Sequence, residues 1–407
     1  MPKLLQINVV SNYLSTGTIV EDISKVAKER GWDTYVAFGR KENPGINKTI
    51  RVGGFFTTVW HYIESRLLDN EGLSSRYATK KFIKQIIQIN PDVIHLHVIH
   101  DHYLNYKILF KFLNKTNISV VWTFHDFWAI TGHCCYFVEV NCNKWELLCC
   151  NCPMFRRTRN SPLIDRSTRN FNLKKELFSS NNKLTIVPVS YWVGEIVKSS
   201  FLKGKRMVVI PNGIDINVFK RDISSHLPFK YDNFFIILGV SKTWAVGDRK
   251  GLDDYLKLSR LLNRDERILL VGEMSEKVSK ALPANIISVG KITDKSQLVS
   301  FYSWADVLLS LSQAETFGLT IIEANACGTP VIVYDNTAPP SLVTKKTGFV
   351  ARNNDINDVF NKIELIKEKG SNSYSDDCVS HVKTFDDRNV NYQKYVDLYE
   401  ELLVSNN

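Results

Sequence analysis

The sequence has no apolar run long enough to cross a membrane. Its longest apolar stretches, such as residues 234–240, have the length of a strand, whereas a membrane-spanning helix needs about 18 or more apolar residues. The first ten residues lack the small-residue cleavage site of a secretory signal and are predicted to form a strand. Low-complexity segments are absent too. We therefore expect a folded protein of the cytoplasm.

The first half of the chain has a net positive charge, which the second half lacks. Residues 1–217 hold 29 Lys and Arg against 17 Asp and Glu, whereas residues 218–407 hold 23 against 25. Seven basic residues crowd into one stretch: Arg156, Arg157, Arg159, Arg166, Arg169, Lys174 and Lys175. Such a stretch attracts anionic lipid, phosphate or nucleic acid, although a solvated helix face would look the same.

The order of elements predicts two α/β domains with doubly wound parallel sheets. Short apolar strands alternate with helical patterns through both halves, as in a Rossmann-like fold. We predict a first domain at 1–217, a second at 218–385 and a helix at 386–407 that packs back on the first domain. Thr18 is the expected N-cap of a helix at residues 18–30. The cleft between two such domains is the expected active site.

The most specific motif lies at residues 315–331, ETFGLTIIEANACGTPV. Glu315 falls in the loop after an apolar strand, and Glu323 falls just over one turn into the helix that Gly318 begins. A carboxylate accepts two hydrogen bonds from a vicinal diol, and the amides at a helix start bind phosphate. These groups suit a nucleotide sugar.

This motif resembles the E-x7-E motif of glycosyltransferase family 4, whose members are retaining enzymes of the GT-B fold. Residues 211–215, PNGID, resemble the turn at the end of the family's first domain, and Lys250-Gly251 resembles its phosphate-binding lysine. The resemblance implies a sugar transfer, without a catalytic metal, from a UDP- or GDP-sugar to a polysaccharide or a polyprenyl-diphosphate-linked glycan. The basic first domain would rest peripherally on the anionic inner face of the cell membrane, which the uneven charge of the two halves favours.

The same resemblance assigns roles in the second domain. Glu323 would hold the ribose diol, Glu315 would contact the transferred sugar, and Lys250 would stabilise the departing diphosphate. The backbone amides of three further residues would line the pocket: Phe317, Gly318 and Leu319. A second phosphate-binding cation could be either Arg249 or Lys242.

The first domain carries a candidate acceptor side. His125 and Asp126 end a predicted strand; by the resemblance the histidine contacts the donor sugar, and Asp126 would orient it or the acceptor. A hydrogen-bonded turn histidine is the alternative. His97 also ends a strand, and Gly17 is the one glycine near the first turn that allows close backbone approach.

Six of the eight cysteines lie between residues 134 and 152, within a segment at 131–153. Four have the spacing of metal ligands: Cys134, Cys142, Cys149 and Cys152. We expect a structural zinc ion there, since a bound metal suits a reducing cytosol better than disulfides; free thiols are the alternative.

A second reading is a nucleic-acid-binding protein that combines the four-cysteine zinc module with the basic stretch. It accounts for the first half of the chain only. A third is an epimerase or phosphorylase on the same fold. The leading prediction, a transferase, requires no nucleic acid.

Overall fold

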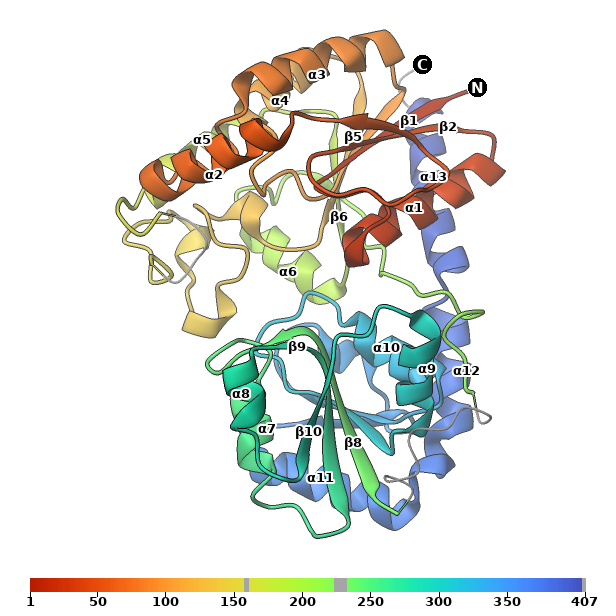
Figure 1. Ribbon diagram of the computed structural model, residues 1–407. Coiled ribbons are helices and arrows are strands. Elements are labelled where there is room, and N and C mark those ends of the chain that lie inside the picture. The colour runs from red at the N-terminus through yellow and green to blue at the C-terminus, as the bar shows by residue number, and fades with distance from the viewer. Residues whose placement is uncertain (157–160, 223–232, 405–407) are drawn as a thin grey trace. The chain divides into compact units, whose positions relative to one another are not determined.

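The computed structural model describes residues 1–156, 161–222 and 233–404, which form two compact units (Figure 1). Unit 1 contains Met1–Pro211 and Val390–Asn407, and unit 2 contains Asn212–Asn389. The division falls six residues before the boundary expected from the sequence. The reason is that Ile214 pairs with the end of unit 2: its amide donates to the carbonyl of Asp386 (2.9 Å).

Unit 1 is built on a seven-stranded parallel sheet with the order β3-β2-β1-β4-β5-β6-β7. Its strands are β1 (Lys3–Asn8), β2 (Asp33–Phe38), β3 (Lys48–Arg51), β4 (Val93–Leu96), β5 (Ser119–Phe124), β6 (Leu184–Pro188) and β7 (Arg206–Met207). Its helices are α1 (Leu14–Glu29), α2 (Phe55–Leu68), α3 (Arg76–Ile89), α4 (Tyr106–Leu113), α5 (Ser167–Ser179), α6 (Tyr191–Ser199) and most of α13 (Arg388–Val404).

Unit 2 has a six-stranded parallel sheet with the order β10-β9-β8-β11-β12-β13. Its strands are β8 (Phe235–Trp244), β9 (Glu266–Met274), β10 (Ile286–Gly290), β11 (Val307–Ser310), β12 (Val331–Tyr334) and β13 (Gly348–Ala351). Its helices are α7 (Leu252–Leu258), α8 (Glu276–Lys280), α9 (Lys295–Trp304), α10 (Leu319–Ala326), α11 (Ile356–Lys369) and α12 (Ser375–Phe385). The two doubly wound sheets confirm the predicted fold class.

The C-terminal helix α13 completes the core of unit 1. Tyr392, Tyr395 and Tyr399 are buried against residues of β1, α1, β4 and β5. The aromatic stripe is therefore packing, as its helical spacing predicts. Arg30, the C-cap residue of α1, adds a surface ion pair to Asp397 (2.7 Å).

The start of α1 differs from the prediction. The helix begins at Leu14 after Tyr13, and Thr18 lies inside it, donating its hydroxyl to the carbonyl of Leu14 (2.9 Å). Thr18 is therefore not an N-cap. Among the described residues, no helix combines the length and apolar character needed to traverse a bilayer.

Candidate functional site

In unit 2 the sheet order reverses direction between β8 and β11. The chain winds outward from these two strands on opposite sides, and loops that follow such a pair form the usual ligand site of an open parallel sheet. Arg249 and Lys250 lie in the loop after β8, and Glu315 lies in the loop after β11. The fold therefore brings together residues that are 65 positions apart.

Lys250 and Glu315 form an ion pair in which Nζ donates to Oε1. The side chains keep 26% and 18% of their exposure, so both can reach a ligand. The backbone of Glu315 is held on both sides by the loop after β12: its amide donates to Thr337 Oγ1 (3.3 Å) and its carbonyl accepts from the amide of Ala338 (3.2 Å). These two bonds fix the backbone position from which the Glu315 carboxylate extends.

Arg249 fastens the two loops to each other. Its Nη1 donates to the carbonyl of Ala314 (2.7 Å), and its own carbonyl accepts from the amide of Gln313 (2.7 Å). Lys242, the other cation considered, is exposed in β8, where its charge helps to lower the pKa of Glu273. Of the two cations, the structure places only Arg249 in contact with the loop that carries Glu315.

Two glycines make this arrangement possible. Gly251 has φ +81°, and a Cβ there would stand 2.2 Å from the carbonyl oxygen of Leu311. Gly318 has φ +117° and is the N-cap of α10. Both positions need glycine, because other residues adopt such φ values only with strain and lack the room.

Glu323 lies on α10, and its Oε2 accepts a hydrogen bond from the hydroxyl of buried Tyr302 (2.7 Å). Burial raises the pKa of Glu323, and the hydrogen bond from Tyr302 acts in the opposite direction. Leu319 opens α10, while the side chain of Phe317 is buried. Phe317 can therefore offer a ligand only its backbone.

Unit 1 has its own reversal point between β1 and β4, and a chain of hydrogen bonds crosses it. Gln6 of β1 accepts at Oε1 from His97 Nε2 (2.9 Å), and His97 Nδ1 meets His125 Nε2 (3.1 Å). The amide group of Gln6 donates to Val20 and Ser24, which leaves its oxygen for His97. These bonds assign the protons of both rings.

The tautomers of His97 and His125 both follow from the acceptor at Gln6 Oε1. Burial lowers the pKa of His97 well below the usual value, so its ring is neutral and carries one proton. That proton is on Nε2, which donates to Gln6, and Nδ1 is therefore an acceptor. His125 must then donate from Nε2 and hold a lone pair on Nδ1, and burial lowers its pKa to about 4. His125 is thus set to accept a hydrogen bond from a hydroxyl group.

Asp126 serves a different partner from the one expected. Its Oδ2 bonds His100 Nε2 (2.9 Å) and its Oδ1 accepts from the amide of Trp128 (2.9 Å). Burial alone would lower the pKa of His100, but Asp126 and Glu71 outweigh it and raise it to about 10. Asp126 therefore fixes the turn after β5 and a charged His100, while His125 is bonded to His97.

Gly17 does not lie in an open turn. It is buried in the first turn of α1, and a Cβ there would stand 3.2 Å from the amide nitrogen of Asn12. Its small size lets the loop after β1 fold against the helix. The close approach that the sequence predicted is therefore to the chain itself.

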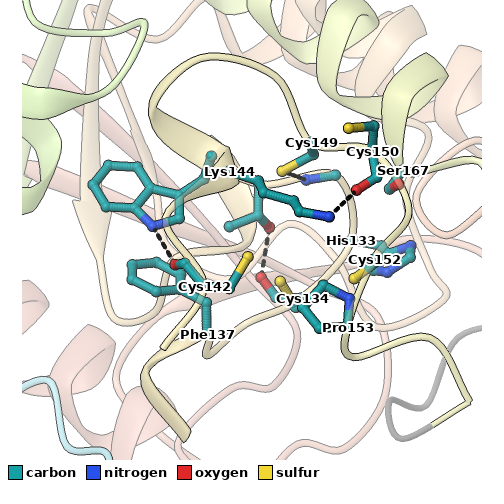
Figure 2. Close-up of a pocket in the computed structure, with 13 residues that line it drawn as sticks. His133, Cys134, Phe137, Cys142, Lys144, Cys149, Cys150, Cys152, Pro153 and Ser167 are labelled. Carbon is teal, nitrogen blue, oxygen red and sulfur yellow. Dashed lines mark hydrogen bonds between the residues drawn. The ribbon is translucent and has the colours of Figure 1, made fainter. Parts of the chain in front are cut away.

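The four spaced cysteines line one small pocket together with His133 and Trp145 (Figure 2). All eight cysteines are free, and Cys149 Sγ accepts a hydrogen bond from the amide of Gly132 (3.3 Å). In the described part of the chain, three groups of ligand-type atoms lie within 4.8 Å of one another: His100, Asp126, Cys135; Asp69, His133, Asp165; and Glu71, Asp101, His102. The four thiols share a pocket at wider spacing.

The basic stretch is not one open patch. Lys174 is buried and donates to the carbonyls of Trp128 (2.7 Å) and Thr131 (3.1 Å). Arg166 and Arg169 both bond Asn70 Oδ1. Arg157 and Arg159 lie outside the described residues. Several of these charges therefore hold unit 1 together, and the nucleic-acid alternative loses its main support.

Two doubly wound parallel-sheet units are the architecture of the GT-B fold. Sequence models agree: glycosyl transferases group 1 matches residues 226–380, and glycosyltransferase family 4 matches residues 16–218. The chain belongs to the family 4-like glycosyltransferases.

The relatives include a glycosyl transferase of Escherichia coli assigned to colanic acid biosynthesis, WcaC. It is 29% identical over 63% of this chain and 63% of that protein, so the chain matches less than two thirds of its length. Alpha-monoglucosyldiacylglycerol synthase of Acholeplasma laidlawii is 22% identical over 68% of this chain and 67% of that protein.

Solved structures share the fold over the whole chain. Sucrose-phosphate synthase of Thermosynechococcus elongatus superposes with a TM-score of 0.74 at 17% identity, covering 100% of both chains. WaaG, a glycosyltransferase of lipopolysaccharide biosynthesis, has a TM-score of 0.66 at 14% identity, covering 97% of this chain and 99% of its own.

Proposed function

We propose that this chain is a retaining glycosyltransferase that moves a sugar from a nucleoside diphosphate donor to a polysaccharide or lipid-linked acceptor. The observation that carries the proposal is the Lys250–Glu315 pair beside the start of α10, at the strand reversal of unit 2. A cation, a carboxylate and exposed helix amides are together the groups that bind a sugar diphosphate.

Each group has a distinct part in the transfer. Negative charge accumulates on the diphosphate as the bond to the anomeric carbon breaks, and the Lys250 ammonium stabilises that charge more in the transition state than in the ground state. Glu315 would orient the sugar hydroxyls, and Glu323 Oε1 would accept from the ribose. His125 would accept a hydrogen bond from a sugar hydroxyl at Nδ1. No step in this scheme needs a catalytic metal.

The relatives support the substrate class without fixing it. One solved neighbour, HepE of Anabaena, is described in complex with UDP and with UDP-glucose, and a mycobacterial relative is named as GDP-mannose-dependent. Other relatives are named for colanic acid or glycolipid synthesis. We therefore propose a UDP- or GDP-sugar donor and an acceptor at the inner face of the cell membrane.

The donor site is tested with two variants of unit 2. Lys250→Ala should lower kcat about 100-fold with little change in donor Kd, because it removes transition-state charge stabilisation. Glu323→Ala should raise donor Kd about 10-fold or more, since it removes charge-assisted hydrogen bonds to the ribose. Isothermal titration with UDP- and GDP-sugars, together with hydrolysis rates, gives both quantities.

Lys280→Ala and Glu276→Ala are the matched controls, because these residues form an exposed ion pair on α8. They should behave as wild type. Unchanged donor affinity in Glu323→Ala combined with unchanged turnover in Lys250→Ala would refute the assignment.

We also propose that Cys134, Cys142, Cys149 and Cys152 bind a structural zinc ion. The four side chains reach one pocket in a segment between β5 and α5 whose described residues form only short 3-10 turns (Figure 2). Sulfur ligands of one zinc ion lie about 4 Å apart, given Zn–S distances of about 2.3 Å. The ion would draw these loops together and stabilise a segment with little core of its own.

A further inference from the structure

Helix α2 buries polar residues and exposes most of its large apolar ones. Its buried residues are polar, His61 and Ser65, whereas its large apolar residues face outward. Phe55 is 71% exposed, Phe56 86% and Trp60 65%. A surface helix of a globular protein normally buries its apolar stripe, so this arrangement needs an explanation.

Hydrogen bonds hold the polar side of α2 against unit 1. His61 Nδ1 bonds Ser75 Oγ (2.8 Å), and His61 Nε2 accepts from the amide of Gly72 (3.0 Å). Burial lowers the pKa of His61 to about 3, so the ring is a neutral bonding group. The outward direction of the apolar side is therefore fixed by specific bonds.

Six exposed apolar residues form one continuous stripe, which we call the outer face of α2, and exposed Tyr62 and Leu68 lie outside it on either side. It consists of Phe55, Phe56, Val59, Trp60, Ile63 and Leu67. At 100° per residue these positions span less than half of the helix circumference. Contiguous apolar surface of this kind marks an interaction site, since scattered exposure would not align.

The neighbouring helix α3 supplies positive charge. Its outer side carries four exposed basic residues, and its sequence RYATKKFIKQIIQI contains no acid. These residues are Arg76, Lys80, Lys81 and Lys84. A groove of about 360 Å³ joins the two helices and is lined by Trp60, Arg76 and Tyr77. Both helices lie on the same flank of unit 1 (Figure 1).

We propose that the outer face of α2 and the basic side of α3 dock on an anionic lipid bilayer. Aromatic and aliphatic side chains would insert at the headgroup level, and the lysines would contact lipid phosphates. A protein partner would need an acidic surface of matching shape, whereas an anionic membrane meets both requirements at once. The proposal adds a binding surface to the proposed function but does not depend on catalysis.

The test compares full-length proteins in vesicle co-sedimentation. Wild type should bind vesicles of phosphatidylethanolamine and phosphatidylglycerol at least 10-fold more tightly than phosphatidylcholine vesicles. The variant Phe55→Ser/Phe56→Ser/Trp60→Ser should lose at least 10-fold in binding to the anionic vesicles, and Lys80→Glu/Lys81→Glu/Lys84→Glu should lose a similar factor and its dependence on lipid charge.

Tyr191→Ser is the matched control, because Tyr191 of α6 is as exposed as Phe55, at 71%. It should bind vesicles like wild type. All variants should keep the wild-type Tm and donor hydrolysis rate, since their changes lie on an exposed surface. The proposal would be wrong if the wild-type protein did not bind anionic vesicles. It would also be wrong if the wild type formed a dimer that only the serine variant abolished. Either result would leave the proposed donor site untouched.

Discussion

At the scale of single residues, Gln6 sets the tautomer of His125 through His97, which bonds both side chains. Gln6 fixes the proton of His97, and His97 fixes the proton of His125. His95 stacks on His97 (3.9 Å between ring centres) and bonds Tyr399 of α13 (2.6 Å). Helix α13 therefore packs against the same group of histidine rings.

This relay predicts a specific effect of Gln6→Leu. Without the acceptor at Oε1, His97 can hold either tautomer, and so can His125; kcat should fall about 5-fold, the equivalent of one lost hydrogen bond of about 1 kcal/mol. Donor KM should hardly change. NMR of the ring nitrogens would report the tautomer directly. Gln393→Leu, an exposed position on α13, is the control.

The pKa of the His125 ring predicts how kcat depends on pH. Burial lowers the pKa of His125 to about 4, so its neutral form is present above that value and is lost only as the pH falls through it. The kcat of the enzyme should therefore show no loss from this group between about pH 5.5 and 8. An acid limb with a midpoint near 6.5 that disappears in His125→Asn would contradict the assignment.

At the scale of elements, apolar periodicity predicted most strands but missed two. The strand β3 was not predicted because it is an edge strand with largely exposed residues, and β13 is also an edge strand, at the end of the sheet of unit 2. Helices α2 and α3 were not predicted either, and the pattern of α2 misleads because its apolar side faces outward. Glu315, Glu323 and Lys250 stood out through spacing and resemblance. Gln6 and Tyr302 did not, because their roles depend on contacts between distant elements.

The cysteine segment gives a prediction at this scale. Purified protein should contain about one zinc ion per chain, and Cys152→Ser should lose it and unfold at a lower temperature, because the loops then lack their cross-link. Metal content by mass spectrometry and thermal unfolding measure both effects.

Cys150→Ser is the control, since Cys150 lines the same pocket but lies outside the ligand spacing. It should retain the metal. Wild-type protein without zinc, in which all four thiols react with an alkylating reagent, would exclude the proposed site.

At the scale of the whole molecule, the chain passes between the two units twice, near residues 211 and 389. Inside unit 2 the two passing segments are paired: Ile214 bridges to Asp387, and Asp215 forms an ion pair with Arg388 (2.6 Å). Asp386 is buried beside them, and burial raises its pKa to about 7.

This carboxyl predicts a pH dependence of stability. Its pKa is higher in the folded state than the ordinary 3.8, so the folded state binds the proton more tightly, and the free energy of unfolding falls as the pH rises from about 4 to about 7. Asp386→Asn should therefore raise the Tm at pH 8 and have less effect at pH 5. Asp376→Asn, an exposed change on α12, should alter neither. Calorimetry of the three proteins at both pH values would settle the sign.

The placement of α13 affects how the protein can be made in the cell. Tyr392, Tyr395 and Tyr399 fill the core of a unit whose other helices and strands all precede position 212. The ribosome synthesises these tyrosines after the whole of unit 2, so the nascent first unit keeps an apolar surface uncovered during that interval. The growing polypeptide is then a substrate for chaperones, and a stop codon just before the codon for Tyr392 would leave a complete unit 2 beside an unfinished unit 1.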